Sequence, residues 1–209
     1  QGHLSSKAGE WNTLLLPGHE LAGKTYGVIG LGRIGQRVAK IASAFGMRVL
    51  AHDPYLDDEG FLQSGALRRS LDEVLRESDV LSLHVPLTKL TRRMINRNTL
   101  EGLHEDSILV NTSRGEVIDE EALLDALKRG EVGAVGLDVF ESEPLKKDSP
   151  LFRHKNVTVS PHVGARTNEA FEKASIQAAE ALVAFSSGRD LPHSLPPTAV
   201  WYTNPMSFD

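Results

Sequence analysis

Short apolar runs alternate with amphipathic stretches along most of the chain. Seven runs have the length and composition of buried strands: 25–29, 48–51, 66–68, 80–85, 107–111, 132–139 and 157–159. Helical spacing of apolar residues predicts five helices between them: 34–45, 71–77, 98–103, 119–129 and 167–187. Strands that alternate with helices pair in parallel and need helices on both faces. The pattern therefore predicts a doubly wound α/β domain with a ligand crevice at the carboxyl ends of its strands.

A glycine-rich turn separates the first predicted strand from the first predicted helix. Three glycines there have the G-x-G-x-x-G spacing of a dinucleotide site: Gly30, Gly32 and Gly35. The first permits a tight turn, the second lets backbone amides approach a pyrophosphate, and the third lets the helix pack closely on the strand. Asp53 ends the next strand, where an acidic residue that binds a ribose diol is expected. Spaced glycines alone also occur by chance, but strand, turn, helix and acid together predict a dinucleotide site.

Three later segments follow predicted strands and carry side chains suited to carbonyl reduction, namely Arg114, Glu143 and His162. An arginine can hold a carboxylate through two hydrogen bonds, and a histidine can transfer a proton near neutral pH. A glutamate beside the imidazole fixes its tautomer and favours imidazolium. Each residue has an ordinary alternative: a surface ion pair, a solvated loop charge, and a hydrogen-bonded loop histidine. Their joint placement favours the site.

Two further histidines, His52 and His84, flank strand ends without an arginine and an acid, so we expect structural or cofactor-lining roles for them. Metal binding is not expected, because the sequence has no histidine or cysteine spacing of the zinc type. The acidic pair Asp57-Asp58 is predicted to lie in an exposed loop.

Composition narrows the class of protein. With 209 residues, of which 40% are hydrophobic, the chain can bury a core, and one large domain is expected. A net charge of -5 gives no broad basic face for nucleic acid or an anionic membrane. Zero cysteines exclude disulfides and thiolate ligands and agree with a reducing compartment, so we expect a cytoplasmic protein. No apolar run approaches the ~20 residues of a membrane span.

Several ordered motifs resemble the nucleotide-binding domain of the D-isomer-specific 2-hydroxyacid dehydrogenases, from about Glu20 to Pro192. The resemblance rests on 30–35, Asp53-Pro54, His-Val-Pro-Leu-Thr at 84–88, Asn-Thr-Ser-Arg-Gly at 111–115, 138–144 and Pro161-His162. It implies that Arg114 anchors the substrate carboxylate and carbonyl, that His162 is the acid/base, and that Glu143 orients it. The implied cofactor is NAD, with Asp53 on the adenosine ribose.

The cofactor-binding residues that the resemblance implies are Gly30, Gly32, Arg33, Ile34, Gly35, Asp53, His84, Val85, Pro86, Thr112, Ser113, Asp138 and Gly164. Asp138 and Gly164 would line the nicotinamide side, and Thr112 and Ser113 would help to place the cofactor.

The departure from the family is in length. Family members carry a second domain ahead of the glycine turn that returns at the C-terminus, whereas here the turn begins at residue 30. We predict an N-terminal segment with the remnant of an interdomain helix at 1–19, a dinucleotide-binding domain at 20–190 and a proline-containing C-terminal tail at 191–209. Residues 11–16 resemble the end of the helix that joins the two domains. We interpret the chain as an excised nucleotide-binding domain, the alternative being a naturally short homologue.

The leading hypothesis is an NAD-dependent oxidoreductase that interconverts a D-2-hydroxy acid and its 2-keto acid, and we expect a homodimer. The family also includes NAD(H)-binding corepressors that recruit peptides, so a regulatory protein is the second hypothesis. A third is a domain that binds NAD and dimerises without turnover. Glyoxylate, hydroxypyruvate, pyruvate and phosphohydroxypyruvate all stay open as substrates.

Overall fold

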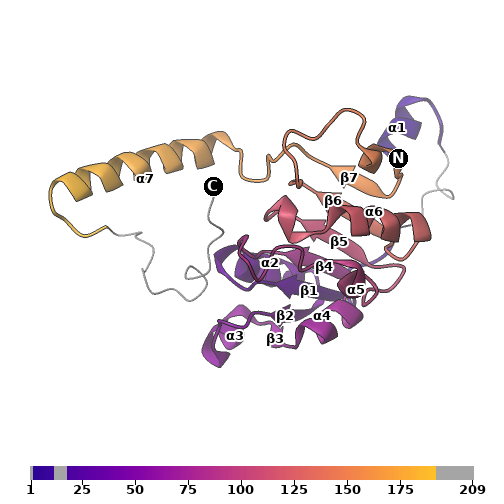
Figure 1. Cartoon of the computed structure of the whole chain (residues 1–209), viewed down its shortest axis with the longest axis horizontal. Helices are drawn as coiled ribbons and strands as arrows, with labels where there is room; N and C mark the ends of the chain where they lie inside the picture. The colour runs from indigo at the N-terminus through magenta and orange to yellow at the C-terminus, as the bar shows by residue number, and fades with distance from the viewer. Residues whose placement is uncertain (1, 12–17, 192–209) are drawn as a thin grey trace.

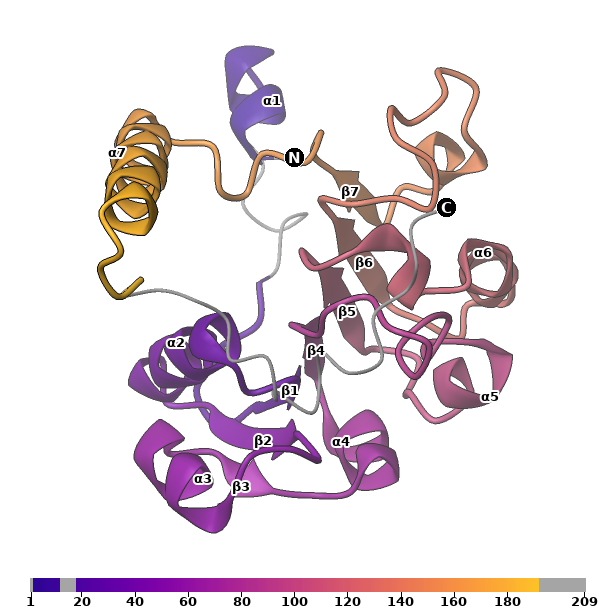
Figure 2. The same cartoon turned by 60° about the vertical axis from the view of Figure 1, so that its left-hand side comes forward.

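The computed structural model describes residues 2–11 and 18–191, and its centre is one parallel sheet. Seven strands form the sheet in this part of the chain, in the order β3-β2-β1-β4-β5-β6-β7 (Figures 1 and 2). Their bounds are β1 Thr25–Ile29, β2 Arg48–His52, β3 Leu67–Arg68, β4 Val80–Leu83, β5 Ile108–Asn111, β6 Ala134–Leu137 and β7 Val157–Val159.

The described helices connect these strands. The α-helices are α1 Gly2–Lys7, α2 Arg33–Ala44, α3 Asp58–Ser64, α4 Leu71–Glu77, α5 Arg97–Leu100, α6 Glu120–Arg129 and α7 Asn168–Ser186. Two short 3₁₀ helices, η2 Gly115–Val117 and η3 Pro150–Arg153, complete the set. None of these helices is long and apolar enough to cross a membrane.

Two apolar clusters pack against the sheet, a larger one that reaches from β2 to β6 and a smaller one confined to the part around β1 and β2. One cluster joins strand residues to α4, α5 and α6 through side chains such as Leu75, Leu100 and Leu123. The other joins β1 and β2 to α2 and α3 through Ala39 and Phe61. Strand order reverses between β1 and β4, and every strand pairing is parallel. The prediction of a doubly wound α/β fold is therefore confirmed.

The carboxyl ends of the strands are aligned across the sheet. Ile29 pairs with His52 on one side and Leu83 on the other. Leu83 pairs in turn with Asn111, Asn111 with Leu137, and Leu137 with Val159. The loops that follow these strands consequently meet along one edge, which is where a doubly wound sheet binds its ligand.

The observed elements depart from the predicted ones at several places. Asp57 ends the loop before α3 and caps this helix by accepting a hydrogen bond from the Gly60 amide, whereas Asp58 is the first residue of the helix. The predicted loop is therefore wrong for Asp58, although both side chains are exposed as expected. Helix α1 is not expected from the sequence, and Trp11 is not helical. The rest of the predicted joining helix and residues 192–209 of the predicted tail lie outside the described residues.

The apolar spacing that predicts α2 does not mark its buried face. Ile34, Ile41 and Phe45 are each more than half exposed, at 66%, 58% and 58%. The helix instead packs on the sheet through Gly35, Ala39 and Ala42. Small residues face the strands because the helix approaches the glycine turn closely, and the larger apolar side chains are left on the outside.

Helix α7 lies apart from the sheet in both views (Figures 1 and 2). It follows β7 after the segment 160–167, and Ala184 is its one buried residue. Thr167 begins it as an N-cap that accepts a hydrogen bond from the Ala170 amide. Its start and end agree with the predicted helix to within one residue.

Candidate functional site

The glycine turn between β1 and α2 has the geometry of a phosphate site. Gly30 has a φ of +90°, and a Cβ there would lie 2.7 Å from the His84 carbonyl oxygen. A Cβ on Gly35 would overlap the Gly30 carbonyl oxygen. Around Gly32 there is open space, and no side chain caps the N-terminus of α2. The first amides of α2 are thus available to an anion, as a pyrophosphate requires.

Asp53 is attached to this turn. Its two carboxylate oxygens accept hydrogen bonds from the Leu31 amide at 2.8 Å and from the Tyr55 amide at 2.9 Å. These bonds join the end of β2 to the turn after β1, so that the carboxylate lies beside the beginning of α2. A hollow of about 560 Å³ adjoins it, lined by His52, Asp53, Pro54, Arg68, Arg69, Ser70 and Glu73.

The segment after β4 lies against the same turn. Strand β4 ends at Leu83, two residues before its predicted end, so that His84, Val85 and Pro86 leave the sheet at its carboxyl edge. The His84 ring nitrogen Nε2 lies 2.7 Å from the Ser82 hydroxyl. Burial lowers the pKa of His84 to about 4, so its ring is neutral at physiological pH. A neutral, partly buried histidine suits a wall of the crevice and not a proton carrier.

His162 and Glu143 form a hydrogen-bonded pair at this edge. The imidazole Nδ1 lies 2.8 Å from Glu143 Oε2, and the other carboxylate oxygen accepts the Phe140 amide at 3.1 Å. The hydrogen bond from His162 lowers the pKa of Glu143, so this carboxylate remains ionised. An ionised carboxylate at Nδ1 selects the tautomer that protonates this nitrogen and leaves Nε2 to face a substrate. Both side chains line a hollow of about 700 Å³ that also includes Phe140 and Phe152.

Asp138 holds the loop that carries His162. Its carboxylate accepts hydrogen bonds from the Ser160 hydroxyl at 2.6 Å, the Val163 amide at 2.9 Å and the Gly164 amide at 2.8 Å. Its carbonyl oxygen accepts the His162 amide at 2.8 Å. Burial opposes the ionisation of Asp138, but these hydrogen bonds outweigh it and its pKa is lowered. The bonds fix His162 in a left-handed conformation with a φ of +51°, which is uncommon for a residue with a side chain.

Asp138 and Gly164, which are predicted to line the nicotinamide side, are therefore in direct contact. Their hydrogen bond holds the loop that carries His162. Nothing in the apolar periodicity indicates this network. It depends on where the loops after β6 and β7 meet, and the strand pairing decides that.

Arg114 lies in the loop after β5. Its guanidinium donates to the Ser113 carbonyl at 2.6 Å and is exposed. That hydrogen bond does not join it to the His162–Glu143 pair. The loop nevertheless contacts the segment after β6, because a Cβ on Gly115 would overlap the Phe140 carbonyl group. The structure thus places the three predicted catalytic residues after neighbouring strands, and brings two of them into contact.

The described part of the chain contains no group of three or more histidine, cysteine, aspartate or glutamate residues that could hold a metal ion.

Two features define a Rossmann-type dinucleotide-binding domain. The N-terminus of α2 follows the glycine turn and has no side-chain cap, and the acidic residue Asp53 follows β2. The chain belongs to the family described as D-isomer specific 2-hydroxyacid dehydrogenase, NAD binding domain, whose model matches residues 1–164. The predicted family is confirmed, and NAD is the cofactor of that family.

Proteins of known name resemble the chain over most of its length. The glyoxylate reductase of Aeropyrum pernix is 46% identical over 183 residues, which cover 88% of the chain and 55% of that protein. The D-3-phosphoglycerate dehydrogenase of Bacillus subtilis is 43% identical over 188 residues, covering 90% of the chain and 36% of that protein. The chain therefore spans about half or less of the length of these two relatives.

Solved structures agree with this picture. The TT0316 protein from Thermus thermophilus is 40% identical with a TM-score of 0.84, covering 93% of this chain and 62% of that one. The D-lactate dehydrogenase with NAD⁺ from Lactobacillus jensenii is 32% identical with a TM-score of 0.80 and the same two coverages.

Proposed function

We propose that the chain is the nucleotide-binding part of an NAD-dependent oxidoreductase that interconverts a D-2-hydroxy acid and its 2-keto acid. The observation that carries the proposal is the 2.8 Å pair of His162 and Glu143 on the same sheet edge as the glycine turn. A histidine oriented by an acid beside a nicotinamide site is the arrangement that carbonyl reduction requires.

NAD, when bound, supplies or accepts the hydride at the carbon that carries the hydroxyl. The residues present fit it, because α2 offers uncapped amides beside open space at Gly32 and a carboxylate at Asp53. We assign its binding to the residues after β1, β2, β4, β5 and β6 and to Gly164: Gly30, Gly32, Arg33, Ile34, Gly35, Asp53, His84, Val85, Pro86, Thr112, Ser113, Asp138 and Gly164.

The chain's own residues would handle the charges and the proton. Arg114, exposed at the crevice edge, would hold the substrate carboxylate through two hydrogen bonds. His162 would donate a proton from Nε2 to the carbonyl oxygen during reduction and remove it during oxidation. Glu143 would stabilise the imidazolium between these steps, since its ionised carboxylate contacts Nδ1.

The test is a panel of keto acids. The 183 matched residues of the chain would replace their counterparts in the A. pernix glyoxylate reductase, and the fusion would be assayed with glyoxylate, hydroxypyruvate, pyruvate and phosphohydroxypyruvate. Reduction of at least one acid by NADH supports the proposal. A folded fusion that binds NADH but reduces none would favour a regulatory protein.

The cofactor preference gives a first prediction. We expect the chain to bind NADH more tightly than NADPH, because a carboxylate accepts bonds from ribose hydroxyls but repels a 2'-phosphate. Each tenfold of preference needs only ~1.4 kcal/mol, which a desolvated like-charge contact exceeds. The arginines near Asp53 already have acidic partners, since Arg68 pairs with Asp58 at 2.6 Å and Arg69 lies 4.0 Å from Glu73. Calorimetric titration with both cofactors measures the preference, and equal affinities would contradict it.

Glu143→Gln should change the pH dependence of reduction. The ionised Glu143 carboxylate lies 2.8 Å from Nδ1 of His162, so its negative charge stabilises a positive charge on the imidazole ring. Glutamine keeps the shape but removes the charge, so the protonated acid is lost at a lower pH and reduction fades sooner as pH rises. The pH profile of kcat/KM in the fusion measures this shift. Glu141→Gln is the control, because Glu141 pairs with Arg93 and not with His162. An unchanged profile for Glu143→Gln would remove the orienting role.

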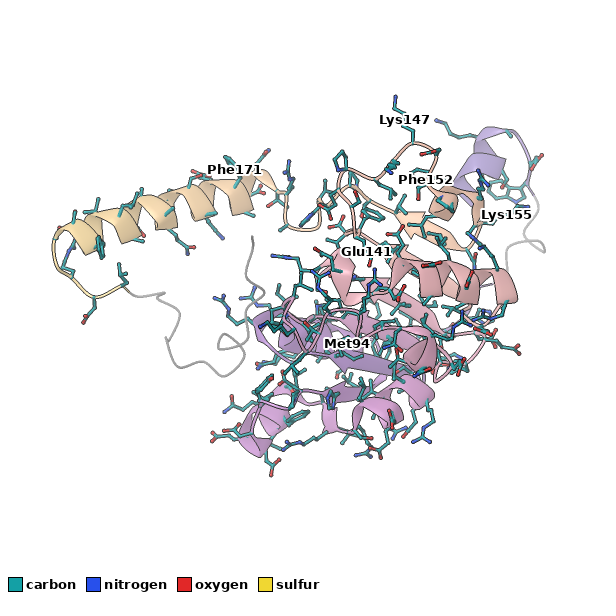
Figure 3. All side chains as sticks on the ribbon, viewed as in Figure 1. Met94, Glu141, Lys147, Phe152, Lys155 and Phe171 are labelled. Atoms are coloured by element: carbon teal, nitrogen blue, oxygen red, sulfur yellow. The ribbon has the colours of Figure 1, made fainter. Side chains whose placement is uncertain are left out.

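The homodimer remains a prediction, and α7 favours it. Phe171, Leu182 and Phe185 are 78%, 70% and 73% exposed, and Figure 3 shows Phe171 on the first turn of α7, away from the sheet. Phe171, Ala174, Ala178, Ala181 and Phe185 have the three-and-four spacing of a helix-pairing seam. An antiparallel pair centred on Ala178 would set Phe171 of one copy against Phe185 of the other, with alanines permitting close approach between them.

Light scattering tests the dimer. We expect the mass of two chains for the wild type and of one chain for a Phe171→Glu, Phe185→Glu variant, since two buried charges per helix oppose pairing. Leu62→Glu on α3 is the matched control, because Leu62 is 82% exposed but lies outside the seam. If the double variant is still a dimer, the interface lies elsewhere.

We also propose a cytoplasmic location for the protein. The proposal rests on the absence of cysteine from the sequence, which agrees with a reducing compartment.

A further inference from the structure

Asn111 is the last residue of β5 and is fully buried. Its side chain turns to the loop that follows the strand. The amide nitrogen Nδ2 donates to the Arg114 carbonyl at 2.9 Å, and Oδ1 accepts the Ser113 amide at 3.0 Å and the Ser113 hydroxyl at 2.8 Å. The side-chain amide of Asn111 thus donates to residue 114 and accepts from residue 113.

The anchor itself is rigid. Asn111 pairs with Leu83 of β4 and Leu137 of β6, and its carbonyl oxygen accepts the Asp138 amide at 3.0 Å. The side chain therefore projects from the centre of the sheet, between the strand that leads to the cofactor segment at 84–86 and the strand that leads to Asp138.

The far end of the same loop is held by contact. Gly115 approaches the Phe140 backbone so closely that a Cβ would overlap its carbonyl group. The backbone of 112–114 is consequently fixed at both ends, by hydrogen bonds from Asn111 and by packing of Gly115. Arg114 starts from a fixed Cα although its guanidinium is exposed.

We propose that Asn111 is a positioning residue for Arg114, an inference that rests on the proposed function of Arg114 as the carboxylate-binding group. The chemistry selects asparagine. Aspartate would keep both acceptor bonds but set an oxygen against the Arg114 carbonyl oxygen, and serine is too short to reach both residues. The groups that Asn111 satisfies belong to the loop and not to the sheet, so its loss should disturb the site more than the fold.

The test uses oxamate, a stable analogue of a 2-keto acid, added to the fusion with the A. pernix glyoxylate reductase saturated with NADH. We expect Asn111→Ala to weaken oxamate binding ~10–100-fold, because displacement of a binding group by about 1 Å can have an effect of this size. NADH affinity should change much less, since the glycine turn and Asp53 are untouched. Asn111→Asp, which keeps the side-chain shape and two of the three bonds, should also weaken oxamate binding and serves if the alanine variant does not fold.

Asn156→Ala is the matched control. Like Asn111, Asn156 donates its amide to a backbone carbonyl, that of Gly133 at 2.9 Å, but it lies at the opposite edge of the sheet. Its loss should lower the melting temperature and leave oxamate binding unchanged. Arg114→Ala should abolish oxamate binding.

The outcomes separate the inference from the proposed function. If Arg114→Ala loses oxamate while both Asn111 variants bind it like the wild type, the inference is wrong and the function stands. If the wild type binds NADH but not oxamate, or if Arg114→Ala binds it normally, the carboxylate role of Arg114 is wrong and the inference falls with it. A wild type that binds no NADH overturns the proposed function itself.

Discussion

The 209-residue chain alone is expected to bind NADH and to reduce keto acids far more slowly than its full-length relatives. It spans 55% of the A. pernix glyoxylate reductase, and the segment 161–170, which carries His162, is exposed throughout. Catalysis depends on holding keto acid and nicotinamide in contact and on excluding water, which together contribute ~7–11 kcal/mol when fully organised. A cleft that is open on one side cannot supply that organisation. The cofactor should still bind, because the amides of α2 and Asp53 are in place for it.

Two measurements decide this prediction. Calorimetry gives NADH affinity, and NADH oxidation with glyoxylate, hydroxypyruvate and pyruvate gives turnover, with the A. pernix enzyme as a reference under the same conditions. Gly30→Val is the control for specific binding, because a side chain there would meet the His84 carbonyl within 2.7 Å at a φ of +90°. Enzyme-like turnover by a monomer of this chain would show that a short, self-sufficient enzyme is in hand.

The sequence predicts the sheet well because its strands are short apolar runs, whether mostly buried, as in β1 and β4, or only partly buried, as in β7. Continuous apolar runs such as 25–29 and 157–159 coincide with β1 and β7, and helix signals at Asp119 and Gly130 mark α6 correctly. Helix α3 is missed because its cap, Asp57, precedes a second acid, and such a pair is typical of a solvated loop. An aspartate at the N-cap position 57, followed by acids at 58 and 59, is the sequence signal that could have indicated it.

Apolar spacing shows that a segment is helical but not which side is buried. In α2 the larger side chains at Ile34, Ile41 and Phe45 point outward, because the sheet accepts only small residues at Gly35 and Ala39. The spacing of the apolar residues alone contains no information about how closely two elements approach. The same limit explains why the sequence does not predict that α7 lies apart from the sheet (Figure 1).

The sequence likewise predicts one part of the candidate site and not another. Residues that follow strands could be named from the sequence, since parallel strands bring their carboxyl ends to one edge. The supporting hydrogen bonds could not, because Asp138 reaches Ser160 and Gly164 across more than twenty residues. The contact between Gly115 and Phe140 likewise joins two loops whose distance only the strand register fixes.

His162→Ala is expected to cause the largest loss of activity of any single substitution considered for this site. In the fusion with the A. pernix enzyme, kcat for keto-acid reduction should fall ~10²–10⁴-fold, the usual contribution of a positioned general acid. Binding of NADH should be unchanged, because His162 makes its hydrogen bonds to Glu143 and the Asp138 backbone and not to the glycine turn. Steady-state kinetics and calorimetry on the same preparation separate the two effects.

His154→Ala is the matched control for that experiment. His154 follows η3 and is half-buried like many loop histidines, but it lies ahead of β7 at the opposite edge of the sheet from His162. Its replacement should change stability slightly and leave kcat unaltered. Since the Glu143 carboxylate would lose its partner in His162→Ala, the pKa of Glu143 should rise toward its ordinary value in that variant alone. A folded His162→Ala fusion with unimpaired turnover would show that another group supplies the proton, and the 2.8 Å pair with Glu143 would then be a structural contact.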